Sequence, residues 1–180
     1  MKTRLFMFPG QGSQQVGMGK DFFEKSQEAK EVFKLADDLL GFSLSQLCFN
    51  GPEDDLKLTC NTQPALLTVS YIAYRLLGEK PEVAAGHSLG EYSALVAAGS
   101  LSFEQALKLV ANRGKYMMEA VPPGQGTMAA IMGLDYGKIE ETLRKVKSGV
   151  VEVANWNSDE QIVIAGEKKA VEEAVEMLQA

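Results

Sequence analysis

The pentapeptide Gly86-His87-Ser88-Leu89-Gly90 constrains the fold of this chain more than any other feature. A short apolar run, 81–85, precedes it, and residues 89–98 have the composition of a helix that stops at Gly99. A G-x-S-x-G pattern between a strand and a helix is typical of a nucleophile elbow, a turn so tight that its serine is strained and needs flanking glycines. An ordinary Gly-Ser turn is the alternative, because the pattern also occurs by chance. The flanking elements favour the elbow and an α/β fold.

A second glycine-rich loop, 8–14, directly follows a predicted strand at 3–8. The loop does not match the sequence patterns of nucleotide-binding loops. Gln15 stands where a dinucleotide loop needs its third glycine, and Met18 stands where a phosphate-binding loop needs lysine. The loop is either a structural turn or the source of one oxyanion-hole amide, the second being the N–H of Leu89 at the start of its helix.

Arg113 is the third feature that indicates chemistry. Ser102 and Gln105 form a capping-box pattern for a helix that runs to about residue 120. The helical spacing predicts that Arg113 shares its apolar face with four residues: Ala106, Leu109, Val110 and Met117. A guanidinium on such a face is costly unless it meets an anion. The anion is either an Asp or Glu in a structural ion pair or a substrate carboxylate in a bidentate clamp; spacing leaves both open.

The remaining sequence divides at the turn-rich segment 121–126. Before it we expect helices at 21–40 and 62–77, separated by a polar loop, 50–61, with one helical turn. After it the pattern is βαββα, a ferredoxin-like split βαβ unit without its last strand. The expected strands are 127–132, 150–154 and 161–165, and the expected helices are 136–147 and 167–180.

Charge and composition exclude several classes of protein. The net charge is −6, with 24 acidic and 18 basic residues, and there is no dense Lys/Arg stripe, so a nucleic-acid binder is not expected. No apolar stretch is long enough to span a membrane, and the first apolar run breaks at Pro9, which does not fit a signal peptide. We therefore expect a cytoplasmic protein. Two cysteines and one histidine give neither metal-ligand spacing nor a disulfide framework.

Taken together, these motifs resemble those of the malonyl-CoA:acyl-carrier-protein transacylase family. The resemblance covers the whole chain in the family's order. The segments that carry it are 8–14, 61–65, 86–91, 112–114 with Met117 and Met118, 121–128, Asn155 with Asn157, and 161–166.

The resemblance implies a fold. We expect an α/β-hydrolase-like core with a parallel sheet and a nucleophile elbow over residues 1–122, incomplete in this sequence. Residues 123–180 are expected to form a ferredoxin-like small subdomain that lacks its last strand.

The resemblance also implies roles for individual residues. Ser88 becomes the serine that is acylated, the backbone amides of Gln11 and Leu89 form the oxyanion hole, and Arg113 binds the malonyl carboxylate. His87 is expected to point away from Ser88 and is not assigned as the base. Four further residues are expected to line or support the substrate pocket: Gln63, His87, Met117 and Asn155.

The implied reaction is ping-pong transfer of malonyl from malonyl-CoA to the phosphopantetheine thiol of acyl carrier protein, a step of fatty acid biosynthesis. No metal or cofactor is expected, since the CoA thioester is a substrate. Acetyl-CoA would leave Arg113 unpaired and should be rejected. Because both the carrier and this chain are acidic, docking needs a local basic patch, for which Lys108, Lys115 and Arg144 are candidates.

In the family, the general base is a histidine in a segment after the small subdomain, and the only histidine here is His87. We therefore expect this chain alone to be nearly inactive, since loss of a general base costs roughly 10²–10⁴ in rate. Malonyl and methylmalonyl preferences are not distinguished. A serine esterase or lysophospholipase and a non-catalytic carrier-docking module are the competing interpretations.

Overall fold

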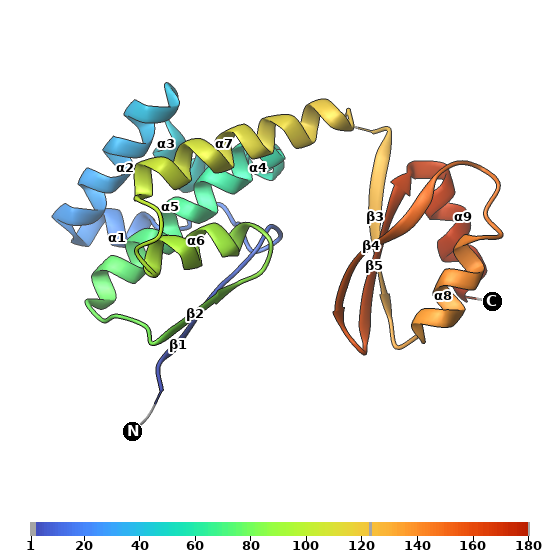
Figure 1. Cartoon of the computed structure of the whole chain (residues 1–180). Coiled ribbons are helices and arrows are strands. Elements are labelled where there is room, and N and C mark those ends of the chain that lie inside the picture. The colour runs from blue at the N-terminus through green and yellow to red at the C-terminus, as the bar shows by residue number, and fades with distance from the viewer. Residues whose placement is uncertain (1–2, 123, 180) are drawn as a thin grey trace. The chain divides into compact units, whose positions relative to one another are not determined.

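The computed structural model describes residues 3–122 and 124–179, so Pro123 of the predicted turn and Ala180 of the last predicted helix lie outside the described residues. The chain forms two compact units, Met1–Glu119 and Ala120–Ala180 (Figure 1). The division comes at the end of a long helix, close to the boundary between residues 122 and 123 that we expected from the turn-rich segment.

The larger unit contains a parallel two-stranded sheet and seven described helices (Figure 1). Strand β1 (Leu5–Phe8) pairs with β2 (Val83–Gly86), with Phe8 opposite Gly86. The helices are α1 (Lys20–Lys25), α2 (Gln27–Leu40), α3 (Leu44–Asn50), α4 (Glu53–Lys57), α5 (Thr59–Leu77), α6 (Leu89–Ala97) and α7 (Phe103–Ala120). The strand–turn–helix sequence predicted around Ser88 is therefore confirmed as β2, turn and α6.

The predicted helix 21–40 is wrong as one element. Ser26 has an extended backbone (φ −128°, ψ 126°), its N–H closes α1 on the carbonyl of Phe22, and its Oγ accepts from the N–H of Ala29 to cap α2. A side chain that competes for backbone hydrogen bonds in this way ends one helix and begins the next.

The predicted loop 50–61 is wrong in part. It contains α4, the single turn we expected, but α5 begins inside it at Thr59 rather than at residue 62. Helix α3 was not predicted, because a helix of two turns shows too few periods to be recognised in the sequence. The largest fully buried apolar side chains of this unit join these helices in one core: Phe33, Leu44, Leu56, Leu67, Ile72, Leu89 and Leu107.

The smaller unit has the predicted order βαββα. Strands β3 (Gly126–Met132), β4 (Val151–Ser158) and β5 (Gln161–Glu167) form an antiparallel sheet in the order β3-β5-β4. Helices α8 (Tyr136–Leu143) and α9 (Lys168–Gln179) lie on one face of it (Figure 1). Helix α8 is shorter, and β4 longer, than predicted. Their shared core includes Ile131, Ile139, Ile162, Ile164, Val171 and Ala174.

A bulge in β4 sets which side chains face this core. The register shifts between Val153 and Asn155, so Asn155 lies opposite Val163 and Trp156 lies opposite the buried Ile162. Trp156 then stacks on Tyr136 of α8, with ring centres 4.9 Å apart. Asn155 therefore lies on the sheet face away from the helices.

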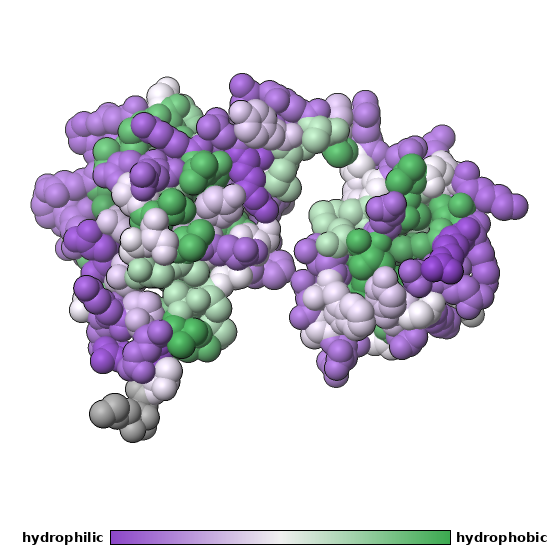
Figure 2. All heavy atoms as spheres, viewed as in Figure 1, coloured by the Kyte–Doolittle hydropathy of each residue, from purple (hydrophilic) through white to green (hydrophobic). Residues whose placement is uncertain are grey.

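The surface of each unit is mixed in polarity. Figure 2 shows hydrophilic residues over the visible face of both units, with hydrophobic residues between them. Over the described residues, no helix combines the length and apolar character needed to cross a membrane.

Candidate active site

Ser88 occupies the sharp turn between β2 and α6. Its backbone angles are φ 52° and ψ −103°, and it is the one non-glycine residue with positive φ in the described part of the chain. Such a conformation costs roughly 1–3 kcal/mol and persists where the surrounding structure imposes it. The strained serine expected from the G-x-S-x-G pattern is thus present.

The two flanking glycines allow the turn because backbone passes where their side chains would be. A Cβ on Gly86 would lie 2.0 Å from the carbonyl carbon and oxygen of Gly90. A Cβ on Gly90 would lie 2.2 Å from the carbonyl oxygen of Phe8. The start of α6 therefore packs directly on the end of β1, which only glycine permits at both positions.

The glycine-rich loop after β1 meets the same turn. His87 N–H donates to the carbonyl of Phe8 at 3.2 Å, and a Cβ on Gly10 would lie 2.6 Å from the His87 carbonyl oxygen. The side chain of Gln11 is tied down by a hydrogen bond from its Nε2 to Thr59 Oγ1 at 3.1 Å. The loop is therefore held beside Ser88 and against the first residue of α5.

Two backbone amides next to Ser88 are available to a ligand. Leu89 is the first residue of α6, so no carbonyl of its own helix can accept from its N–H. Within residues 3–122 and 124–179, the structure gives no acceptor to the N–H of Leu89 or of Gln11. These are the two amides that the resemblance assigns to an oxyanion hole, and that role stays a prediction.

Arg113 lies beside the serine. Its Nη2 donates to Ser88 Oγ at 2.9 Å and its Nη1 donates to Gln63 Oε1 at 2.7 Å. The guanidinium carbon lies 5.9 Å from the ring centre of Tyr92, within the range of a cation–π contact. Arg113 forms no ion pair with a carboxylate of the described residues. Within these residues, the structure therefore gives no support to the first of our two alternatives, the structural ion pair.

The predicted position of Arg113 on the core face of its helix needs correction. The buried residues of α7 are Phe103, Ala106, Leu107, Val110 and Gly114. Leu109 and Met117, which we placed on this face, are each 47% exposed. Arg113 lies between them and is half-buried, at the margin of the core. The face is shifted because Gly114 packs on α5, where its Cβ would lie 2.7 Å from Cys60 Cα.

Gln63 and Met117 are in contact with each other and, through Gln63, with Arg113, while their predicted role in a substrate pocket stays a prediction. Gln63 is fully buried, and its Nε2 donates to Met117 Sδ at 3.2 Å. Met117, Gln63, Arg113 and Ser88 thus form one continuous chain of hydrogen bonds.

The two remaining predicted pocket residues are both exposed. His87 is exposed at the turn, and Asn155 is exposed on β4 of the smaller unit, so their roles in a pocket stay predictions. The docking candidates Lys115 and Arg144 form ion pairs with acids four residues away, Glu119 at 3.7 Å and Glu140 at 3.2 Å.

Sequence reasoning missed Thr59 and Tyr92. Thr59 lies one turn before Gln63 on α5, and Tyr92 lies one turn after Ser88 on α6. Both could have been predicted from the candidate residues Gln63 and Ser88, because residues four apart share a helix face.

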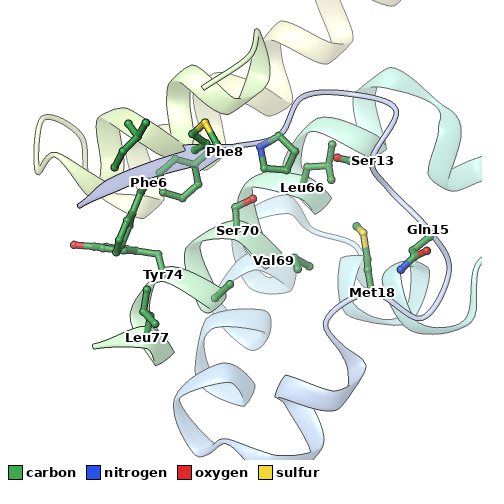
Figure 3. Close-up of a pocket in the computed structure, with 14 residues that line it drawn as sticks. Phe6, Phe8, Ser13, Gln15, Met18, Leu66, Val69, Ser70, Tyr74 and Leu77 are labelled. Atoms are coloured by element: carbon green, nitrogen blue, oxygen red, sulfur yellow. The ribbon is translucent and has the colours of Figure 1, made fainter. Parts of the chain in front are cut away.

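An open groove of about 520 Å³ lies between β1 and α5 (Figure 3). Phe6 and Phe8 of β1 face Ser70 and Tyr74 of α5 across it. Neither Ser88 nor Arg113 lines this groove, so it is separate from the candidate site. No group of three or more His, Cys, Asp or Glu residues in the described part is arranged to hold a metal ion.

Comparison with known proteins gives consistent matches over the whole chain. The model of the acyl transferase domain family matches residues 5–180. The malonyl CoA-acyl carrier protein transacylase of Bacillus subtilis (strain 168) is 50% identical over 98% of this chain and 57% of its own length. The protein of the same name from Escherichia coli (strain K12) is 50% identical over 97% of this chain and 58% of its own.

The solved structures that resemble this chain include transacylases of the same kind. A malonyl-transacylase in complex with a type II PKS acyl-carrier protein has a TM-score of 0.91 at 45% identity, over 99% of this chain and 59% of its own. The transacylase of Coxiella burnetii has a TM-score of 0.90 at 45% identity, over 99% and 58%. This chain therefore spans less than two thirds of the length of each of these relatives.

Proposed function

Because this chain belongs to the acyl transferase family, we propose that it carries the nucleophile and the carboxylate-binding residue of a malonyl-CoA:acyl-carrier-protein transacylase. The resemblance to that class drawn from the motifs is confirmed by the relatives. The observation that carries the proposal is the contact between Ser88 and Arg113, a guanidinium without a carboxylate partner among the described residues.

The first half-reaction makes a malonyl-serine. Ser88 Oγ attacks the thioester carbon of malonyl-CoA, and the carbonyl oxygen of the tetrahedral intermediate accepts from the amides of Gln11 and Leu89. The carbon–sulfur bond then breaks, and CoA leaves as the thiol with the proton that Ser88 lost. Arg113 binds the distal carboxylate throughout, which requires its guanidinium to be free of protein acids.

The second half-reaction repeats this chemistry in reverse. The phosphopantetheine thiol of an acyl carrier protein attacks the malonyl ester, a carbon–sulfur bond forms, and Ser88 regains its proton as the ester bond breaks. Acyl transfer of this kind needs no metal or organic cofactor, and we propose none. A place in fatty acid biosynthesis in the cytoplasm fits this substrate pair.

We also propose the finer description of the fold. The parallel β1–β2 pair, the strained Ser88 and the flanking glycines support an α/β-hydrolase-like core over residues 1–122. The βαββα order and the β3-β5-β4 sheet support an incomplete ferredoxin-like subdomain over residues 123–180.

Mass spectrometry of the chain after prolonged incubation with malonyl-CoA tests the proposal. We expect a malonyl adduct on the peptide that contains Ser88, its loss on addition of holo acyl carrier protein, and no adduct in Ser88→Ala. Ser100→Ala, an exposed change beyond the end of α6, serves as the control and should label like the parent chain.

Two other results would contradict the proposal in distinguishable ways. Labelling of Ser88 by a fluorophosphonate but not by malonyl-CoA, together with cleavage of simple esters, would indicate a serine esterase. Labelling by neither reagent, with retained binding of acyl carrier protein, would indicate a non-catalytic docking module.

A further inference from the structure

The buried amide of Gln63 is engaged at both ends. Its Oε1 accepts from Arg113 Nη1 at 2.7 Å, and its Nε2 donates to Met117 Sδ at 3.2 Å. We infer that Gln63 is a positioning residue that holds Arg113 through a neutral hydrogen bond and keeps the guanidinium charge available to a substrate carboxylate. This inference rests on the proposed function, and it narrows the expected role of Gln63, which was to line or support the pocket, to acting through Arg113.

The orientation of the amide follows from its neighbours. Arg113 offers only donors, so the group that faces it must be the carbonyl oxygen of Gln63. The NH₂ end then needs an acceptor in a fully buried position, and Met117 Sδ supplies a weak one. A flipped amide would place N–H groups against the guanidinium and leave the thioether opposite an oxygen. Met117 therefore stabilises the orientation of Gln63 that binds Arg113.

The groups that surround the guanidinium of Arg113 are uncharged. Arg113 contacts an amide, a hydroxyl and an aromatic ring, from Gln63, Ser88 and Tyr92, and none of these groups is a carboxylate. A glutamate at position 63 would fit the same space and accept the same hydrogen bond. It would also neutralise the cation and compete with the carboxylate of the substrate. A glutamine gives position without charge compensation.

The backbone supports this arrangement. Helices α5 and α7 approach so closely at Gly114 that a Cβ there would lie 2.7 Å from Cys60 Cα and 2.8 Å from the carbonyl oxygen of Thr59. Gln63 lies one turn after Thr59, and Arg113 immediately precedes Gly114. Because the two helices are this close, the side chains of Gln63 and Arg113 form their hydrogen bond across a short distance.

Binding of malonyl-CoA and of acetyl-CoA, measured by calorimetry on the full chain, tests the inference independently of turnover. In Gln63→Glu we expect malonyl-CoA affinity to fall at least about tenfold, since a charge-assisted interaction is lost, while acetyl-CoA affinity changes less than about twofold. In Met117→Leu, the buried NH₂ group loses its acceptor, and malonyl-CoA affinity should fall about fivefold. Gln105→Glu adds the same charge earlier on α7 and retains a capping-box residue, so it should bind like the parent chain.

The outcomes separate this inference from the proposed function. If the parent chain shows no preference for malonyl-CoA over acetyl-CoA, the proposed function fails. If the parent chain prefers malonyl-CoA and Gln63→Glu keeps that preference, the positioning role of Gln63 is wrong. If Gln63 has a purely structural role, Gln63→Glu should lower the affinity for both thioesters equally, and Gln63→Leu should lower both affinities more than Gln63→Glu does. That pattern also overturns the inference.

Discussion

Arg113 Nη2 donates a hydrogen bond of 2.9 Å to Ser88 Oγ, so the cation and the candidate nucleophile are in direct contact. An acyl group bonded to Ser88 has its first carbon at this oxygen. A carboxylate bound by Arg113 must then follow after very few bonds. The contact therefore limits the length of the diacid as well as its charge.

We predict a strong dependence of Ser88 acylation on acyl chain length. Malonyl-CoA should acylate Ser88 at least about tenfold faster than succinyl-CoA, and glutaryl-CoA should be slower again, because each added methylene pushes the carboxylate past the guanidinium. Mass spectrometry of the Ser88 peptide after incubation with equal concentrations of the three thioesters gives the ratio directly.

The matched control for this prediction is Arg113→Gln, which keeps hydrogen-bonding capacity and removes the charge. All three thioesters should then acylate Ser88 slowly and at similar rates. Equal rates for malonyl and succinyl groups in the parent chain would show that the Arg113–Ser88 distance does not select the substrate.

The strained backbone of Ser88 predicts an effect on stability. At φ 52°, glycine is favoured over any other residue, so Ser88→Gly should raise the free energy of unfolding of the larger unit by about 1 kcal/mol relative to Ser88→Ala. Both variants lose the hydroxyl, so their difference isolates the backbone. Far-UV circular dichroism during urea unfolding measures it.

The single tryptophan gives an internal control for this experiment. Trp156 lies in the smaller unit, on β4, so its fluorescence follows the unfolding of that unit. Its transition should be the same in Ser88→Gly and Ser88→Ala. A Ser88→Gly variant less stable than Ser88→Ala would show that the left-handed conformation is not strained in the folded chain.

The close packing of α7 on α5 predicts the effect of Gly114→Ala. The added Cβ would meet backbone atoms of Cys60 and Thr59, which cannot rotate away, so we expect a loss of about 1–3 kcal/mol. Arg113 should shift from Gln63, and malonyl-CoA affinity should fall with the stability. Gly137→Ala in α8 is the control, since its Cβ would meet only the side-chain oxygen of Asp135 at 3.0 Å.

Much of this architecture is local in the sequence and could be predicted from it. Glycines on both sides of Ser88 indicated the turn, and Ser102 with Gln105 indicated the capping box, whose two hydrogen bonds the structure contains. These features depend on residues within five positions of each other. The break at Ser26 is just as local but went unrecognised, because apolar spacing continues across it.

The electrostatic character of the site depended on contacts that spacing does not reveal. Arg113 finds its partners 50 and 25 residues away, at Gln63 and Ser88. Helical periodicity placed it on an apolar face but gave no means of choosing between a protein acid and a neutral amide. The shift of the buried face toward Gly114 likewise follows from helix packing, which a single helix does not encode.

Cys48 provides a final prediction, which concerns alkaline pH. Burial, reinforced by the negative charge of Asp37, raises the pKa of the Cys48 thiol from 9.0 to about 12, and the side chain is fully buried in the larger unit. At pH 8.5, iodoacetamide should therefore modify the partly exposed Cys60 and leave Cys48 unmodified unless urea is added. Peptide mapping distinguishes the two sites.

The same shift makes stability depend on pH in a defined window. Between pH 9 and about 12 the unfolded chain loses the Cys48 proton while the folded chain retains it, so the folded state binds more protons and its stability falls as pH rises. Below pH 9 this contribution is fully present. Cys48→Val, which has no proton to lose, should reduce the fall in urea midpoint between pH 9 and 10.5. If the Cys48→Val chain loses stability over this interval as steeply as the parent chain, the thiol is not the group responsible.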